Sequence, residues 1–370
     1  MTGSGAFADD LGPHKIIEVW EPKLGLEAIL VVDNVACGPS IGGLRMAPDV
    51  TKEECFRLAR AMTLKNAAAS LAHGGGKSVL RADPKMPLEQ KERLVRAFAS
   101  ALRGESAYIF GPDMGTDERC MAWVKDEIGR AVGLPAELGG IPLDELGATG
   151  WGLRHAIEAA LAHLNQPLQG ARVVVQGYGA VGYHAARFLA GKGARLVAAS
   201  DSRGAVRNDA GIDPLALAAL KKHGKGVAEF DEAQPMAKED LIAVPCEIWI
   251  PAARPDVIDE GNVDRLDARI VAQGANIPAT AGAEQHMYKK GILSLPDFIA
   301  NAGGVICAAM EYHGASQSAA FAAIAEKLRR NTTEVLELAA RQDCAPREAA
   351  MQMAETRVRR AMATRRWSIF

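Results

Sequence analysis

The part of the chain that most suggests chemistry is LAHGGGKSVL, residues 71–80, in which three glycines lead into Lys77 and a serine. The end of a phosphate-binding loop has this pattern. That loop needs a glycine five positions before its Gly-Lys pair, and this position holds Leu71. The spacing therefore argues against a phosphate site. We expect the glycines to clear space near Lys77 so that backbone or a small ligand can come close.

Two further ionisable residues stand out near this segment. Lys65 precedes Lys77 by 12 residues, and Asp113 lies in the loop GPDMGT after an apolar run. A lysine is usually an ordinary surface residue, but the intervening NAAASLAHGGG is small and apolar, unlike a solvated face. Because active-site groups often occupy such loops, Asp113 is a second candidate.

A second glycine motif, GYGAVG, begins at Gly177. VVVQ precedes it, the helical pattern YHAARFLAGKG follows it, and the next strand pattern ends at Asp201, 24 residues after Gly177. This order predicts a dinucleotide site with pyrophosphate on the helix N-terminus and the ribose on Asp201. A glycine turn in another α/β protein is the alternative. The residues assigned to this site are Gly177, Gly179, Ala180, Val181, Gly182 and Asp201.

The residue after the second strand bears on the choice of dinucleotide. An acidic residue such as Asp201 favours NAD, because it binds the ribose 2′-hydroxyl. Ser202 and Arg203 follow it directly, and an arginine there can pair with a 2′-phosphate. NAD is therefore the expected cofactor, and NADP stays open.

Composition narrows the class of protein. The chain has 370 residues, of which 48% are hydrophobic, and this indicates a globular protein of two domains. Its formal net charge of −2 gives no electrostatic argument for binding nucleic acid or an anionic membrane. The six cysteines stand singly, which predicts reduced thiols, a cytoplasmic location and no metal cluster. We see no apolar run long enough for a signal peptide or a membrane helix.

The elements expected in the first half are strands and helices in alternation. We predict a strand at 26–33, a glycine-rich turn at 38–46, and a helix from Thr51, which with Glu54 forms a capping-box pattern. This helix carries Lys65 near its end. A short strand at 78–83, a helix at 87–104 and a strand leading to Asp113 follow.

The pattern that we assign to a second domain begins near residue 148. A helix at 149–164 precedes the glycine motif, and short apolar strands recur at 247–253 and 268–275. Strands alternating with helices predict a parallel sheet, so the fold class is α/β with a C-terminal Rossmann domain. We place the first domain at 1–145 and the dinucleotide-binding domain at 146–329, with helices at about 330–370 packing back on the first domain.

The motifs taken together carry a family resemblance. GPSIGGLRM, Lys65-Asn66, GGGK, GPDMGT, ATGWG, GYGAVG, IPAA, QGANIPAT and PDFIANAGGV occur in one order over roughly residues 20–315. This pattern resembles the glutamate/leucine/phenylalanine/valine dehydrogenases. The resemblance implies reversible oxidative deamination of an L-amino acid to a 2-oxo acid and ammonia with a nicotinamide cofactor. It also implies a homo-oligomer formed by the first domain, and a cleft between the two domains.

The resemblance also implies roles for single residues. Lys65 matches the lysine that holds the substrate α-carboxylate, Lys77 the lysine that activates water, and Asp113 the carboxylate that shuttles protons. A lysine can act as a base near neutral pH only if burial and nearby positive charge lower its pKa, and Lys65 is expected to supply that charge. Other matching positions lie near the nicotinamide or the substrate; they are Gly42, Gly43, Thr149, Ala252, Asn276 and Asn301.

The choice of amino acid turns on Ile41. The resemblance implies that the corresponding position of glutamate dehydrogenases holds a lysine, which binds the distal carboxylate of glutamate. An isoleucine cannot neutralise that carboxylate. Val305 and Ala308 match pocket positions and are also apolar. The expected substrate is a non-acidic amino acid of the leucine, valine or phenylalanine type. Glutamate with a relocated carboxylate partner is the alternative, and a catalytically silent nucleotide-binding or assembly protein is the alternative of another class. Trp151 departs from the pattern.

Overall fold

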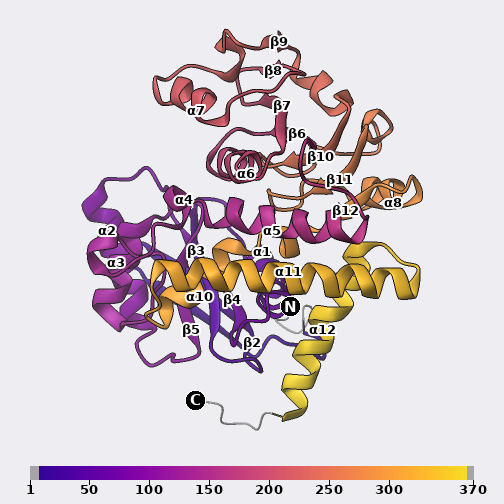
Figure 1. Cartoon of the computed structure of the whole chain (residues 1–370). Helices are drawn as coiled ribbons and strands as arrows, with labels where there is room; N and C mark the ends of the chain where they lie inside the picture. The colour runs from indigo at the N-terminus through magenta and orange to yellow at the C-terminus, as the bar shows by residue number, and fades with distance from the viewer. Residues whose placement is uncertain (1–7, 365–370) are drawn as a thin grey trace. The chain divides into compact units, whose positions relative to one another are not determined.

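The computed structural model describes residues 8–364, which form two compact α/β units (Figure 1). Within the described residues, unit 1 comprises residues 8–142, Val305–Ala320 and residues 351–364, and unit 2 comprises Leu143–Gly304 and Phe321–Ala350. The expected α/β fold class is confirmed. Residues 365–370 of the C-terminal range named above lie outside the described part.

Unit 1 is built on a five-stranded sheet of order β1-β2-β4-β3-β5. β3 runs parallel to β4 and β5, whereas β2 is antiparallel to both β1 and β4, so the sheet is mixed. The glycine-rich turn predicted at 38–46 is wrong for most of its length, because Ser40–Ala47 form β3 inside the sheet. The strands are β1 (Lys15–Glu21), β2 (Leu26–Asn34), β3 (Ser40–Ala47), β4 (Gly74–Arg81) and β5 (Tyr108–Pro112).

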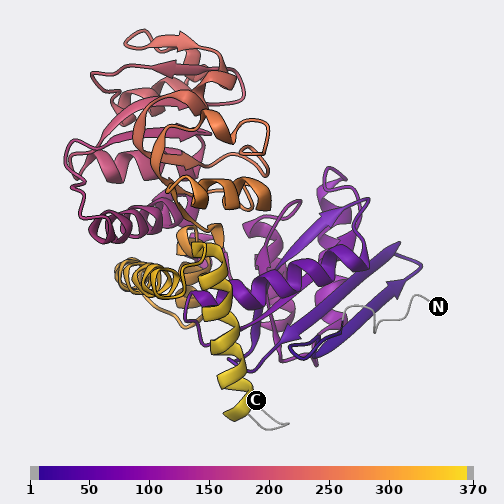
Figure 2. The same ribbon diagram turned by 90° about the vertical axis from the view of Figure 1, so that its right-hand side faces the viewer.

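Successive side chains along the strands point to opposite faces of this sheet, and both faces are buried. Figure 2 shows the backbone of the sheet and its helices from the side. One face is covered by α2 (Leu88–Ala101) and α3 (Glu118–Ile128), whose Phe98 and Met121 pack with Leu44 of β3. The other face is covered by α1 (Lys52–Ala68), whose Cys55 and Phe56 pack with Val31 and Val79. Since Lys77 is two residues before Val79, it lies on the α1 face.

The three glycines before Lys77 belong to strand β4 and not to a loop. A Cβ on Gly75 would lie 1.9 Å from the backbone N of Thr63 in α1, and one on Gly74 would lie 1.8 Å from the carbonyl of Asn34. The glycines therefore let a helix and neighbouring backbone approach the strand closely. Of the two partners expected to come close, backbone or a small ligand, backbone is the one found at Gly74 and Gly75.

Helix α1 begins where the capping pattern predicts. The side chain of Thr51 accepts a hydrogen bond from the backbone N–H of Glu54, and the helix extends to Ala68, which places Lys65 in its last turn. Residues 351–364 of α12 (Pro346–Thr364) belong to unit 1, where Arg357 donates to the carbonyls of Ala67 and Ala68 at the end of α1.

Unit 2 contains a seven-stranded sheet of order β12-β11-β10-β6-β7-β8-β9. Five strands are parallel, and β8 and β9 form an antiparallel edge that the sequence did not predict. The carboxyl ends of the parallel strands share one edge, where ligands bind in such sheets. The strands are β6 (Arg172–Gln176), β7 (Arg195–Ser200), β8 (Ala205–Arg207), β9 (Gln234–Met236), β10 (Cys246–Pro251), β11 (Ala268–Ala272) and β12 (Leu293–Leu295).

Helices α5 (Ala148–His163), α6 (Ala180–Ala190) and α11 (Gln317–Gln342) meet around Trp151. Its indole N–H donates to the carbonyl of Phe321 at 3.0 Å, and its ring contacts Phe188 and Phe321 edge-on or tilted. Trp151 is thus a packing residue of unit 2. Among the described helices, none is both long and apolar enough to span a bilayer.

Candidate active site

The centre of the candidate site in unit 1 is an ion pair between Lys77 and Asp113. Nζ of Lys77 lies 2.8 Å from Oδ2 of Asp113, and Nε of Arg45 lies 2.8 Å from the same oxygen. Arg45 also pairs with Glu54 of α1 at 2.5 Å. One carboxylate oxygen therefore receives two cationic donors, and the structure brings together residues from β3, β4 and the loop after β5.

Burial makes the electrostatics of this cluster unusual. Lys77 is 5% exposed, and this burial lowers its pKa. The negative charge of Asp113 partly offsets the effect of burial, and the positive charge of Arg45 lowers the pKa further. For Asp113, burial opposes ionisation, but the charges of Lys77 and Arg45 outweigh it and hold its pKa below the usual range. Arg45 is thus a cation that acts on Lys77 and that the sequence did not predict.

Strand alternation explains why these residues share a face. A Cβ on Gly43 would lie 2.8 Å from Cβ of Asp113 and 3.1 Å from Nζ of Lys77, so Gly43 faces the ion pair. Ile41 and Arg45 are two residues on either side of Gly43 and lie on the same face. Ile41 is 4% exposed. A buried apolar side chain therefore stands two positions along the strand from the glycine that faces the lysine.

The loop that carries Asp113 is held by its own hydrogen bonds. The backbone N–H of Asp113 donates to Oγ1 of Thr116 at 3.0 Å, and that hydroxyl donates to the carbonyl of Leu44 in β3. Asp117 then caps α3 by accepting from the N–H of Cys120. The loop is short and fastened at both ends, which fixes the carboxylate against Lys77.

The remaining residues predicted for the substrate lie at several places in unit 1. Lys65 is half-buried in the last turn of α1. The position of a Cβ on Gly42 falls 1.8 Å from the carbonyl of Gly76, so Gly42 faces the neighbouring strand while Gly43 faces the ion pair. Val305 and Ala308 share the partly exposed stripe of α10 (Gly303–Tyr312).

In unit 2, GYGAVG forms the turn between β6 and α6. Gly177 has φ +95°, in the region that favours glycine, and a Cβ on Gly182 would lie 2.1 Å from the carbonyl of Gly177. A Cβ on Gly179 would meet nothing within 4 Å, and Gly179 is the N-cap of α6, followed by Ala180 and Val181. The turn is tight where the chain folds back and open at the helix N-terminus, which fits a pyrophosphate.

Of the other residues predicted for the dinucleotide, Ala252 and Asn276 follow the carboxyl ends of two strands of this sheet, β10 and β11. Nδ2 of Asn301 donates to Oδ1 of Asn276 at 3.0 Å, while Oδ1 of Asn301 is buried and has no partner among the described residues. The backbone N–H of Ala252 donates to the carbonyl of Gln176. Thr149 faces Gly304, whose Cβ would lie 3.3 Å from its hydroxyl. The buried, unpaired amide oxygen of Asn301 fits a site that takes a ligand donor.

Asp201 follows β7 directly, as predicted, but its carboxylate is already bonded within unit 2. Oδ1 accepts from the N–H of Arg203, and Oδ2 accepts from Nζ of Lys221 and the N–H of Val227. Ser202 and Arg203 are exposed in the turn that follows.

Sequence reasoning missed Arg45, Glu54 and Lys221 as members of these sites. A signal for Arg45 existed, because Gly43 and Arg45 alternate within GGLRM and would share a face if that segment were read as a strand. Lys221 comes from a helix 20 residues after Asp201, and nothing in its local pattern marks it.

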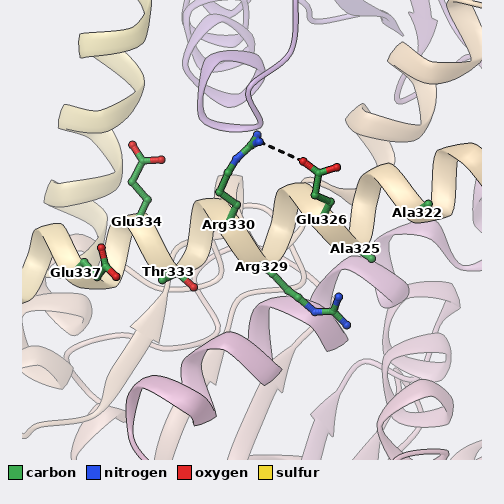
Figure 3. A pocket seen from close by; sticks show the side chains of 8 residues that line it. All are labelled: Ala322, Ala325, Glu326, Arg329, Arg330, Thr333, Glu334 and Glu337. Atoms are coloured by element: carbon green, nitrogen blue, oxygen red, sulfur yellow. Dashed lines mark hydrogen bonds and ion pairs between the residues drawn. The ribbon is translucent and has the colours of Figure 1, made fainter.

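A surface hollow of about 780 Å³ lies along α11 (Figure 3) and contains none of the residues named above. Its side chains come from a single helix, and Arg330 pairs there with Glu326. No group of three or more possible metal ligands occurs in residues 8–364. The lining residues are Ala322, Ala325, Glu326, Arg329, Arg330, Thr333, Glu334 and Glu337.

Comparison with protein families gives two matches that together span most of the chain. Residues 14–130 match the Glu/Leu/Phe/Val dehydrogenase dimerisation domain, and residues 139–366 match the Glutamate/Leucine/Phenylalanine/Valine dehydrogenase domain.

Curated relatives and solved structures give the same result. The chain is 37% identical to a glutamate dehydrogenase of Aeropyrum pernix over 90% of its own length and 85% of the relative's. It is 37% identical to an NADP(+)-dependent glutamate dehydrogenase of Pyrobaculum calidifontis, over 83% and 80% of the two chains.

Two solved structures have the same fold. One is a hetero-hexameric glutamate dehydrogenase of Thermus thermophilus in a leucine-bound form, with TM-score 0.83, 29% identity and coverage of 97% of this chain and 91% of that one. The other is an L-tryptophan dehydrogenase of Nostoc punctiforme, with TM-score 0.77, 25% identity and coverage of 95% and 98%.

Proposed function

Because the chain belongs to the Glutamate/Leucine/Phenylalanine/Valine dehydrogenase family and is an amino acid dehydrogenase, we propose that Lys77 and Asp113 carry out its chemistry. The reaction is the reversible oxidative deamination of an L-amino acid to a 2-oxo acid and ammonia. The observation that carries the proposal is the 2.8 Å contact between the buried Lys77 and Asp113. These are the two groups that deamination needs, a base for water and a carrier for the protons of the amino group.

Each residue has a defined task in this proposal. Lys65 binds the α-carboxylate, since a carboxylate taken out of water needs a cationic partner. Lys77, whose pKa burial lowers, takes a proton from the water that attacks the oxidised Cα. Asp113 accepts and returns protons at the amino group as ammonia leaves. Arg45 is a positioning residue, because it holds the Asp113 carboxylate in place.

Unit 2 is proposed to hold a nicotinamide dinucleotide. When bound, NAD or NADP accepts the hydride from Cα of the amino acid. Gly177, Gly179 and Gly182 shape the turn that binds the pyrophosphate through backbone N–H groups at the start of α6. Asn276 and Asn301 orient the nicotinamide end, where the Asn301 amide oxygen is free to accept a hydrogen bond.

The names of the relatives favour glutamate as the amino acid. Both curated relatives described above are glutamate dehydrogenases, which supports the reading that the sequence ranked second. With Ile41 in place of a lysine, this requires another cation to bind the distal carboxylate.

A non-acidic amino acid is the second candidate, and the position of Ile41 favours it. This side chain is 4% exposed and lies on the face of β3 that carries Gly43 and Arg45. An apolar side chain there suits a leucine-like substrate better than a carboxylate.

A substrate panel tests the proposal and separates the two candidates. Reduced dinucleotide is measured with L-glutamate, L-leucine, L-valine, L-phenylalanine and L-tryptophan, each with NAD and with NADP. Activity on any of them supports the amino acid dehydrogenase. Glutamate as the best substrate supports the first candidate, and activity only on apolar amino acids supports the second. Dinucleotide binding without turnover of any L-amino acid would instead indicate a silent binding protein.

Two broader features complete the proposal. The match of residues 14–130 to a dimerisation domain supports a homo-oligomer formed through unit 1. The six cysteines are free within the described residues, which supports a reducing compartment such as the cytoplasm.

A further inference from the structure

Two histidines from distant parts of the sequence meet in unit 1. His73 immediately precedes β4, and His313 immediately follows α10. Their Nε2 atoms lie 3.1 Å apart, and the centroids of their rings are 5.2 Å apart. The reaction proposed above gives neither ring a task, so the pair is a feature separate from that chemistry.

A second hydrogen bond of His73 decides which of its ring nitrogens carries a proton. Nδ1 of His73 lies 3.0 Å from the carbonyl oxygen of Pro39, and a carbonyl can only accept, so Nδ1 is the protonated nitrogen. His73 is 2% exposed, and burial disfavours a charged ring with a second proton. Nε2 of His73 therefore offers a lone pair to His313. Histidines that bind metals show the same arrangement, in which the other ring N–H donates to a carbonyl or carboxylate.

The backbone around His73 is held tightly. The N–H of Gly74 donates to the carbonyl of Gly38 at 3.1 Å. A Cβ on Gly38 would lie 2.1 Å from the carbonyl oxygen of Ala72, so the two backbone segments are in direct contact. The position of the His73 ring is thus fixed on both sides of its own residue.

His313 is held by the way in which α10 ends. The N–H of Gly314 donates to the carbonyl of Glu311, the N–H of Ala315 donates to that of Met310, and Gly314 has φ +69°, which together form a Schellman ending. The carbonyl end of a helix carries partial negative charge, which favours a cation beside it. Since His313 is exposed, an ion can reach the pair from solvent.

The separation of the two nitrogens is close to that of two ligands on one metal ion. Zinc binds imidazole nitrogen at about 2.0–2.1 Å in tetrahedral geometry, so two histidine nitrogens on one zinc lie about 3.3 Å apart. The observed 3.1 Å requires only a small movement of the exposed His313. Imidazole suits zinc, copper and nickel, whereas magnesium and calcium take oxygen ligands.

We propose that His73 and His313 bind one divalent transition-metal ion of the zinc class through their Nε2 atoms. Because residues 8–364 contain no group of three possible ligands, water completes the coordination. The Nε2 proton of His313 passes to water and Nδ1 takes one up, so the ring is neutral before and after binding. The ion joins the strand that carries Lys77 to the helix that carries Val305, and it stabilises unit 1 because it binds only when these segments are folded together.

Titration of the full chain with Zn²⁺ tests this site. The protein is first freed of metal with a chelator, and binding is measured by isothermal titration. His313→Gln should weaken zinc binding at least about tenfold, because one of the two protein ligands is lost. His73→Gln should have the same effect, and the exposure of His313 makes His313→Gln the variant that is safer for folding. His163→Gln, at an exposed histidine that ends α5, is the matched control and should bind zinc as the unchanged protein does.

Two further measurements make the assignment specific. Zn²⁺ should raise the midpoint of thermal unfolding of the unchanged protein and of His163→Gln, and should leave that of His313→Gln where it is. Cys37 and Cys344 are the two cysteines that are not buried among the described residues, and replacing both by serine should leave zinc binding intact.

Three results would overturn the metal site. The first is the absence of saturable zinc binding to the unchanged protein. The second is equal binding by the unchanged protein, His73→Gln and His313→Gln. The third is loss of binding in the cysteine double variant, which would assign the ion to thiolates. None of these depends on turnover, so the zinc site and the proposed dehydrogenase reaction stand or fail separately.

Discussion

Nζ of Lys77, which is buried on the α1 face of the sheet, lies 2.8 Å from Oδ2 of Asp113, whose side chain is 25% exposed in the loop after β5. Burial and Asp113 act on the lysine in opposite directions, and burial prevails, so that the pKa of Lys77 falls. The pair is therefore poised to move a proton, and most predictions below follow from its geometry.

Removing the amine should abolish most of the turnover without unfolding the chain. We expect Lys77→Ala to lower kcat by roughly 10²- to 10⁴-fold, because the general base is lost. Initial rates of reduced dinucleotide formation and circular dichroism would be measured together. Lys125→Ala, at an exposed lysine of α3, is the control and should keep full activity. Full turnover of Lys77→Ala would reject the proposed base.

The pH profile should report the same group. Since Lys77 acts as a base only when neutral, kcat/KM should rise with pH and level off once Lys77 has lost its proton, below the ordinary pKa of a lysine. Arg45→Gln removes a positive charge that lowers this pKa, so the rising limb should move to higher pH. A limb that stays in place in Arg45→Gln would contradict the electrostatic role of Arg45.

Gly43 should be intolerant of a single methyl group. A Cβ there would lie 2.8 Å from Cβ of Asp113 and 3.1 Å from Nζ of Lys77, so Gly43→Ala should separate the pair and lower kcat/KM strongly. The overpacking should cost about 1–3 kcal/mol of stability. Gly104→Ala, where the added Cβ meets nothing within 4 Å, is the matched control. Equal activity of the two variants would show that Gly43 does not face the reacting groups.

What could be predicted from the sequence depended on how far apart the interacting residues lie. The dinucleotide turn is local, since the glycines, the strand and the helix follow one another. The family that the motifs indicate together is confirmed. The meeting of Lys77, Asp113 and Arg45 instead depends on the pairing of β3 with β4 and β5.

Arg45 was not predicted as a site residue, because SIGGLRM was interpreted as part of a turn. Only a strand places Ile41, Gly43 and Arg45 on one face. The glycines before Lys77 were recognised as places of close approach, but what approaches them is helix α1, through Thr63. That contact joins separate segments and has no signature in local sequence.

Substitution at Ile41 separates the two substrate candidates. If a leucine-like substrate contacts this side chain, Ile41→Lys should lower kcat/KM for apolar amino acids at least about tenfold and raise the relative rate with glutamate. The ratio of kcat/KM for glutamate and leucine is the measurement. If another cation already binds the side-chain carboxylate of glutamate, Ile41→Lys should not raise the ratio of kcat/KM for glutamate to that for leucine. That result would favour glutamate as the substrate.

Stability towards acid should depend on His155 in unit 2. Burial lowers its pKa to about 4, against the opposing effect of Glu158. The folded state thus binds this proton less readily than the unfolded state, so His155 contributes stability above the unfolded pKa of about 6.5 that is lost as pH falls towards about 4. His155→Gln should flatten the free energy of unfolding over this interval. Denaturant titrations at several pH values measure this free energy. If His155 plays no part, the free energy of unfolding will depend on pH in the variant as it does in the unchanged protein.

The most direct test of the central claim follows the hydrogen on Cα. The preferred L-amino acid from the panel, deuterated at Cα, is incubated with the protein and the oxidised dinucleotide, and the reduced dinucleotide and ammonia are analysed by mass and amount. The account predicts deuterium in the reduced nicotinamide and one ammonia for each dinucleotide reduced, with both products formed at least about a hundredfold more slowly by Lys77→Ala. Reduced dinucleotide without deuterium, or without an equal amount of ammonia, would contradict it.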